Sequence, residues 1–184
     1  MVLLQAATAI IGLPVVSIAD GEDVAEVRDV VYDPAAGRLV GMTLNKRGFL
    51  SGRSPDVLPA EGIAAIGRDA VMIEDTDGLA SRREPGETGA PAADRNVLGD
   101  DVLTEKGTSL GIVRDLIVMV GGRGEVVGYR IETPEGREAY IPLPAQLAVS
   151  GAALVVPEAT ERFVRDDLVG LAGAVDEFRS RLDL

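Results

Sequence analysis

The chain has 184 residues, of which 46% are hydrophobic and 26% are charged, a balance typical of a folded globular protein. Its net charge of −12 repels nucleic-acid phosphates, so we expect no direct nucleic-acid binding. The absence of Cys and His removes disulfides, thiolate chemistry, the commonest general base and the best transition-metal ligands. We therefore expect no catalytic residue, no metal site and no cofactor.

The N-terminal segment, residues 1–18, is apolar but lacks the features of a signal peptide. The first basic residue is Arg28, and Pro14 interrupts the apolar run. Polar residues and Gly12 also break the run too often for a membrane-spanning helix. We expect a lead-in followed by a buried strand, with no membrane insertion and a cytoplasmic location.

A repeated pattern follows this segment. Residues 21–32 align with residues 107–118 at an offset of 86 (107 minus 21), and both segments carry a Gly, a Val, an Arg and an Asp at matching positions. Residues 39–44 align with residues 126–131 at an offset of 87 (126 minus 39). A repeat of this length indicates duplication of one structural unit.

The offset changes only where turns are expected. The gain of one residue falls within two corresponding turns, at 33–37 in the first copy and 121–124 in the second, which we interpret as hairpin tips. The offset falls to 83 at Pro59 and Pro142 (142 minus 59), because the first copy has a longer loop after Leu44. Hairpin tips tolerate insertions and paired strands do not, so the pattern favours duplication over chance.

Each copy is predicted to be a meander of five or six short strands, enough to curl into a small barrel. A short apolar strand leads into a strand rich in Val and Ile, a hairpin, a third strand, a fourth strand, a helical turn and a closing strand. The third strand is expected to turn alternate residues to one face: Val40, Met42 and Leu44 in the first copy, and Val127, Tyr129 and Ile131 in the second.

Two further segments lie outside the repeat. Residues 75–96 are rich in Gly, Pro and charge, which predicts a flexible linker. Residues 158–184 change to a helical period and predict an amphipathic helix. Its apolar seam packs either on a barrel of the same chain or between copies in a homo-oligomer. The seam consists of Val164, Leu168, Leu171, Val175, Phe178 and Leu182.

These motifs together resemble the PRC-barrel family. The resemblance rests in the first copy on residues 11–21, 27–29, 33–41, 58–59 and 66–71. In the second copy it rests on residues 111–115, 127–128, 141–142 and the closing strand, although the Asp-Pro turn is missing. It covers residues 9–74 and 97–157.

The resemblance implies an all-β fold with two small PRC-type (SH3-like) β-barrels in tandem and a C-terminal amphipathic α-helix. The expected boundaries are 1–74, 75–96 for the linker, 97–157, and 158–184 for the helix. In the family, which includes the cytoplasmic domain of the photosynthetic reaction-centre H subunit and the C-terminal domain of a ribosome maturation factor, the barrel positions partners. It therefore implies no catalytic residue and no particular partner.

A polar pair recurs in both copies: Arg28 with Asp29, and Arg114 with Asp115. The strand alternation places both aspartates on the inner face, where a carboxylate must be hydrogen-bonded or paired. One interpretation is a titratable site. The other, which we favour because both copies keep the pair, is a structural carboxylate bound to backbone amides or to an Arg.

A loop of the first copy contains Lys46, Arg47, Phe49 and Leu50, a combination of basic and aromatic residues that is unusual in this chain. We favour packing of Phe49 onto its own barrel, because most bulky apolar residues are buried; the alternative is a partner-contact loop. The acidic clusters at residues 20–23 and 100–101 lack the ligand spacing of a calcium loop and are interpreted as turns.

We expect a non-enzymatic scaffold or adaptor that binds a protein partner. The alternative is a sensor that binds a small ligand or an ion in a barrel mouth or in the crevice between barrels. An enzyme that uses only carboxylates ranks third, because no pair of carboxylates stands at a useful spacing.

Overall fold

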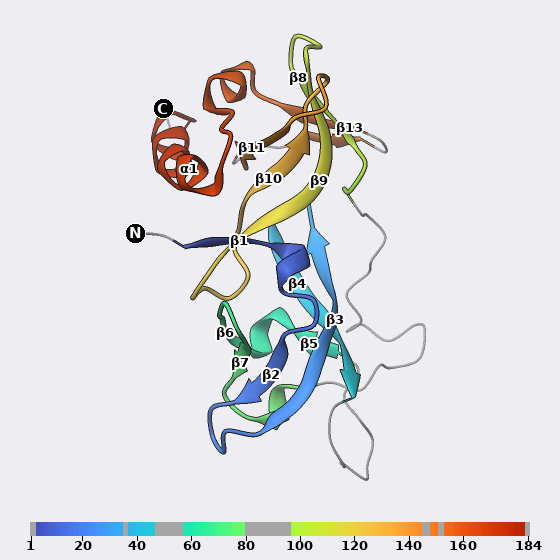
Figure 1. Cartoon of the computed structure of the whole chain (residues 1–184), viewed down its shortest axis with the longest axis vertical. Coiled ribbons are helices and arrows are strands. Elements are labelled where there is room, and N and C mark those ends of the chain that lie inside the picture. Colours follow the sequence, from blue (N-terminus) through green and yellow to red (C-terminus); the bar gives the residue numbers. More distant parts are fainter. Residues whose placement is uncertain are drawn as a thin grey trace.

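The computed structural model describes residues 3–34, 37–46, 57–79, 97–144, 148–150 and 153–182. The fold is mostly β, with two sheets and one C-terminal α-helix (Figure 1). The N-terminal sheet consists of β2 (Pro14–Ser17), β3 (Asp23–Asp33), β4 (Arg38–Lys46), β5 (Val57–Pro59), β6 (Ile63–Ile66) and β7 (Val71–Ile73). The C-terminal sheet consists of β8 (Asp101–Thr104), β9 (Ser109–Met119), β10 (Val126–Glu132), β11 (Glu138–Pro142), β12 (Ala148–Ser150) and β13 (Ala153–Val156), joined by β1 (Leu4–Ala6).

The two sheets have the same strand order. The N-terminal sheet runs β5-β4-β3-β2-β7-β6, and the C-terminal sheet runs β11-β10-β9-β8-β13-β12. In each sheet one pair is parallel, β2 with β7 and β8 with β13, and every other pair along the path is antiparallel. The meander predicted from the sequence is therefore present in both halves.

The irregularities of the ladders also coincide. In the β3–β4 pair the register skips Arg28, and in the β9–β10 pair it skips Arg114. A second irregularity skips Val40 in β4 and Val127 in β10. An extra residue in one strand reverses the facing of the residues that follow it.

The second irregularity corrects one prediction about the third strand. Val127 does not share a face with Tyr129 and Ile131, because the skipped residue turns it to the opposite side of β10. There it packs against the C-terminal helix, while Tyr129 and Ile131 are buried in the main core. Residue alternation alone carries no sign of such a bulge.

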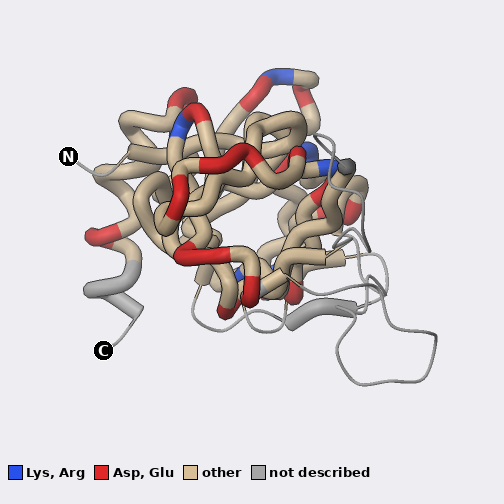
Figure 2. Tube along the Cα trace, turned by 90° about the horizontal axis from the view of Figure 1, so that it is seen from below, with Lys and Arg blue, Asp and Glu red and all other residues tan. Residues whose placement is uncertain are grey.

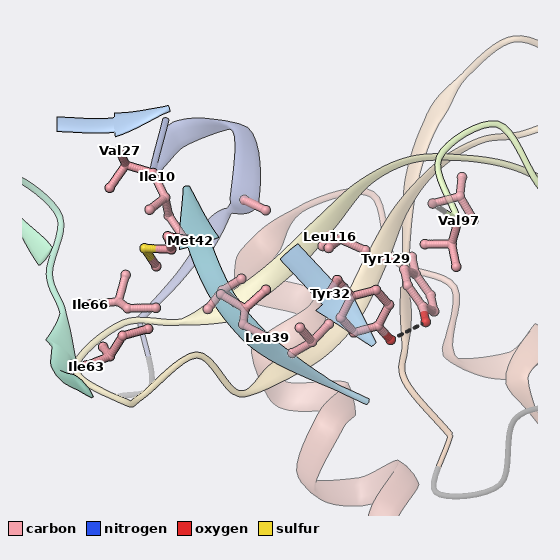
Figure 3. Close-up of a cluster of buried hydrophobic side chains, with 14 of the residues drawn as sticks. Ile10, Val27, Tyr32, Leu39, Met42, Ile63, Ile66, Val97, Leu116 and Tyr129 are labelled. Atoms are coloured by element: carbon pink, nitrogen blue, oxygen red, sulfur yellow. Dashed lines mark hydrogen bonds between the residues drawn. The ribbon is translucent and has the colours of Figure 1, made fainter. Parts of the chain in front are cut away.

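The two sheets share one hydrophobic core. A single cluster of buried side chains runs from Ile10 and Val27 in the first half to Leu116 and Tyr129 in the second (Figure 3). Figure 1 shows why: the β9–β10 hairpin reaches down to β6, and the paired ends of β3 and β4 rise beside β9. Each half therefore extends one hairpin into the other.

The N-terminal strand strengthens this connection. β1 pairs antiparallel with β9, with Gln5 opposite Val118, and the Val120 amide donates to the Leu3 carbonyl at 2.8 Å. After β1 comes a 3₁₀ turn, η1 (Ala7–Ala9), which crosses β9 before the chain enters β2. Residues 4–6 thus pair within the C-terminal sheet, although the sequence places them in the first copy.

The helix begins later than predicted. Residues 158–163 form a 3₁₀ helix, η4 (Glu158–Phe163), Val164 is extended, and α1 spans Leu168–Leu182. Arg165 exchanges backbone hydrogen bonds with Tyr140 at 2.7 and 2.8 Å, which holds this segment on the edge of β11. Asp167 then caps α1, because its carboxylate accepts from the Gly170 amide at 2.6 Å.

Leu171, Ala174, Val175 and Phe178 of α1 pack inside the chain, whereas Val169 is 81% exposed. Leu171 and Val175 contact a cluster with Ile117 and Tyr140 on the outer face of the C-terminal sheet. Phe178 meets the Phe163 ring edge-on, with the ring centroids 5.0 Å apart. Of the predicted seam, Val164 lies outside the helix and the Leu182 side chain lies outside the described residues.

Acidic positions are scattered along much of the trace, with fewer basic positions among them (Figure 2). In the part of the chain that the structure describes, no helix is both long and apolar enough to cross a membrane.

Candidate functional site

A pocket opens at the junction of the two sheets, with a volume of about 180 Å³. It is lined by η1, by the middle of β3, by the start of the second half and by β9. We call it the junction pocket; its lining residues are Ala7, Thr8, Ile11, Asp29, Val30, Val31, Tyr32, Val97, Leu98, Asp115 and Leu116. Most of these side chains are apolar, and two are carboxylates.

The lining comes in equivalent pairs from the two halves. Asp29 and Val30 of β3 correspond to Asp115 and Leu116 of β9. Ile11 and Leu98, which line the pocket in the two halves, are each followed by a glycine. The amides of Gly12 and Gly99 donate to the carbonyls of Val27 and Val113 respectively, each at 2.8 Å. The pocket therefore lies where the two halves present the same surface to each other.

The outer apolar pair consists of Ile11 and Leu98. Each is 43% exposed, and they are among the few large hydrophobic side chains that remain open to solvent in the described part of the chain. Most large aliphatic side chains in the described part of the chain are buried, so these two are exceptions that lie beside the pocket.

The two carboxylates differ in their surroundings. Asp115 is 1% exposed, and both of its oxygens are occupied. Oδ1 accepts from the Leu116 amide at 2.8 Å and from the Thr8 amide at 3.3 Å, while Oδ2 accepts from the Thr8 hydroxyl and from Arg130 at 3.3 Å. Arg130 also reaches Glu138 at 3.3 Å. Asp115 thus ties β9 to η1 and to β10, as a structural carboxylate would.

Asp29 is exposed, and its Oδ1 accepts from the Val30 amide at 2.8 Å. Among the described residues its Oδ2 has no partner. The prediction that both aspartates face the inside of a barrel is wrong, because the bulges at Arg28 and Arg114 turn them outward. Asp115 is nonetheless buried, because η1 and Arg130 cover it.

Residues 5–80 match the family model of the PRC-barrel domain. This segment is a PRC-barrel domain. A comparison with curated proteins found no match. The PRC-barrel domain spans β1 to β7, so its first strand is the one that pairs with β9, and one wall of the junction pocket is built from it.

The tip of the β9–β10 hairpin holds the PRC-barrel domain in place. Ile66 donates to the Gly122 carbonyl at 2.9 Å and accepts from the Gly121 amide at 2.8 Å, and Leu39 donates to the Gly124 carbonyl at 3.1 Å. Gly124 has a φ of +104°, and a Cβ there would lie 3.1 Å from the Leu39 side chain. These backbone contacts fix the two walls of the pocket relative to each other.

A pair of tyrosines joins the two halves, and one of them, Tyr32, also lines the pocket (Figure 3). The hydroxyls of Tyr32 in the PRC-barrel domain and Tyr129 in β10 are 2.6 Å apart and hydrogen-bonded, and the rings meet edge-on at 6.3 Å. Burial raises the pKa of Tyr32 to about 12 and raises the pKa of Tyr129 well above its ordinary value. Both phenols therefore stay protonated at neutral pH.

Other predicted sites are partly outside the described residues. Lys46 ends β4, and the rest of the predicted contact loop, Arg47, Phe49 and Leu50, lies outside the described residues. Arg28 and Arg114 are exposed bulge residues that bond to Thr43 and Glu132 at 3.3 and 3.2 Å. No group of three or more acidic side chains is placed to hold a metal ion within the described ranges.

Sequence reasoning missed Thr8, Ile11, Tyr32 and Leu98 as site residues. The signal for Ile11 and Leu98 was available, since each precedes a glycine and they are 87 positions apart (98 minus 11). Thr8 could not be found in this way, because its role depends on β1 crossing to the other sheet.

Proposed function

We propose that the chain is a non-enzymatic protein-binding scaffold in which residues 97–157 form a second PRC barrel beside the first. Shared strand order, shared parallel pairs and coincident bulges support the second barrel. So do Gly41 and Gly128, which sit opposite Pro59 and Pro142 in the two sheets.

The observation that carries the binding function is the junction pocket. It is open, mostly apolar and formed jointly by both halves, with the exposed pair Ile11 and Leu98 at its edge. Protein interfaces concentrate their binding energy in such small pockets, which accept one anchor side chain. The interlocked hairpins keep the two walls together, and that rigidity lowers the entropic cost of binding. A cytoplasmic location remains part of the proposal.

A sensor for a small ligand is the second candidate, because the pocket lies in the crevice between the halves. Its volume of about 180 Å³ favours a protein partner, since pockets for small molecules usually measure about 300–1,000 Å³.

The test uses the full chain as bait in a lysate of its source organism, with a protein of equal charge as a control. The proposal expects a saturable protein partner whose binding is then reproduced with purified components. A thermal-shift screen with metals and metabolites runs in parallel. Stabilisation by a metabolite, together with no protein retained above the control, would overturn the scaffold and favour the sensor.

A further inference from the structure

The junction pocket carries an inference about the chemistry of the partner. We infer that it receives one large apolar side chain of a partner protein, with a lysine or arginine beside that side chain contacting Asp29. The inference rests on the proposed function and names the kind of surface that the scaffold binds.

The size and lining of the pocket determine the anchor. A volume of about 180 Å³ suits a single side chain, and the walls contributed by Val30, Val31, Val97 and Leu116 are aliphatic. Ile11 and Leu98 also line the pocket, and each is 43% exposed. A leucine, methionine or phenylalanine would bury its whole side chain here, whereas a polar side chain would leave its hydrogen-bonding groups unsatisfied.

The two carboxylates of the pocket indicate which charge the partner carries beside its anchor side chain. Asp115 accepts four hydrogen bonds within the chain and has no capacity for a partner. Asp29, at the equivalent position, is exposed and uses one oxygen for the Val30 amide, and no described residue occupies the other. Because the chain carries a net charge of −12, a cation at this position also gains from the field of the whole protein.

The difference in exposure between Asp29 and Asp115 fixes the orientation in which the partner binds. The anchor enters between the two halves, and the basic residue of the partner must lie on the β3 side, because η1 and Arg130 close the β9 side. A partner with an acidic residue beside its anchor would face Asp29 and be repelled.

The experiment is an NMR titration of the full chain with blocked dipeptides: acetyl-Leu-Lys-amide, acetyl-Leu-Glu-amide and acetyl-Ala-Lys-amide. The expected result is shifts of the Val30, Val31 and Leu116 amides, with the Leu-Lys peptide bound about twofold to fivefold more tightly than the Leu-Glu peptide. The Ala-Lys peptide should bind at least about tenfold more weakly than the Leu-Lys peptide, because it leaves the pocket empty. No shift at these amides, or equal affinities for the Lys and Glu peptides, would overturn the inference.

Matched variants separate the pocket from general charge. Asp29→Asn should abolish the preference for lysine, whereas Asp69→Asn, which removes the same charge from an exposed turn between β6 and β7, should keep it. Equal loss in both variants would show that only net charge matters and would contradict the inference. Thermal unfolding of both variants establishes that they remain folded.

The lysate experiment distinguishes failure of the scaffold proposal from failure of the inference about the anchor side chain. A protein partner that binds the wild-type chain and the Leu98→Lys variant equally would leave the scaffold standing and remove the pocket as its anchor. No captured partner, together with stabilisation by a metabolite in the thermal-shift screen, would instead remove the scaffold.

Discussion

The N-terminal and C-terminal sheets share a backbone pattern, but they differ in what covers it. The same bulge turns Asp29 and Asp115 to the outer side of equivalent strands. In the C-terminal sheet, η1 and Arg130 cover the carboxylate, and α1 covers the neighbouring face, while Asp29 stays exposed. Equivalent local sequences thus acquire different surroundings from segments that are distant in the chain: Asp115 is bonded to η1 and to β10, whereas Asp29 stays exposed.

The largest effect is expected where the two sheets are most alike. An added Cβ would lie 2.3 Å from the Ile141 carbonyl oxygen at Gly128 and 2.7 Å from the Leu58 carbonyl oxygen at Gly41. Both ladders would have to open, so Gly128→Ala and Gly41→Ala should each lower the free energy of unfolding by about 3 kcal/mol or more. Urea titration measures the free energy of unfolding of both variants. A decrease in only one of them would contradict the structural equivalence of the two sheets.

The two aspartates should differ next. Asp115→Ala leaves Thr8 and Arg130 without their acceptor and should lower the free energy of unfolding by about 2–4 kcal/mol. Asp29→Ala should change it by less than about 0.5 kcal/mol. Chemical denaturation of both variants checks the pair, and equal effects would contradict the assignment of a structural role to Asp115 alone.

The tyrosine pair predicts a loss of stability at high pH. Burial raises the folded-state pKa of Tyr32 from 10 to about 12, so the unfolded chain releases its proton first as the pH rises. The contribution of Tyr32 to the free energy of unfolding is complete below pH 10 and is lost between pH 10 and about 12. A series of urea titrations over this range should show a shallower decline in Tyr32→Phe, and an identical decline would count against burial of the phenol.

The smallest effect is expected at the bulges themselves. Arg28 and Arg114 are exposed and bond only to Thr43 and Glu132 among the described residues, so replacing either by alanine should cost no more than about 1 kcal/mol. A much larger loss in either variant would mean that the arginine, rather than the ladder, fixes the bulge.

Most strands could be predicted from the sequence, because they are runs of Val, Ile and Leu bounded by turn residues. β1 was not predicted, and β6 and β12 lie where only a helical turn was expected before the closing strand. The face of the sheet on which each side chain lies could not be predicted, because the bulges at Arg28 and Val127 reverse the alternation and residue type gives no sign of them. The helix was predicted too long, because an apolar spacing continues through Val164 while Arg165 pairs with β11. The pocket depends on β1 and on a hairpin crossing between halves, and such long-range pairings leave no local pattern.

The account depends on the two sheets forming one unit, so that the junction pocket has fixed walls. Native-state hydrogen exchange in increasing denaturant tests this, because it reports the free energy of opening for β3 and β9 separately. The interlocked hairpins and the common core predict that the central amides of both strands open with the same free energy. Opening of β3 at clearly lower denaturant, with β9 still protected, would contradict the account and leave the pocket as the gap between two independent domains.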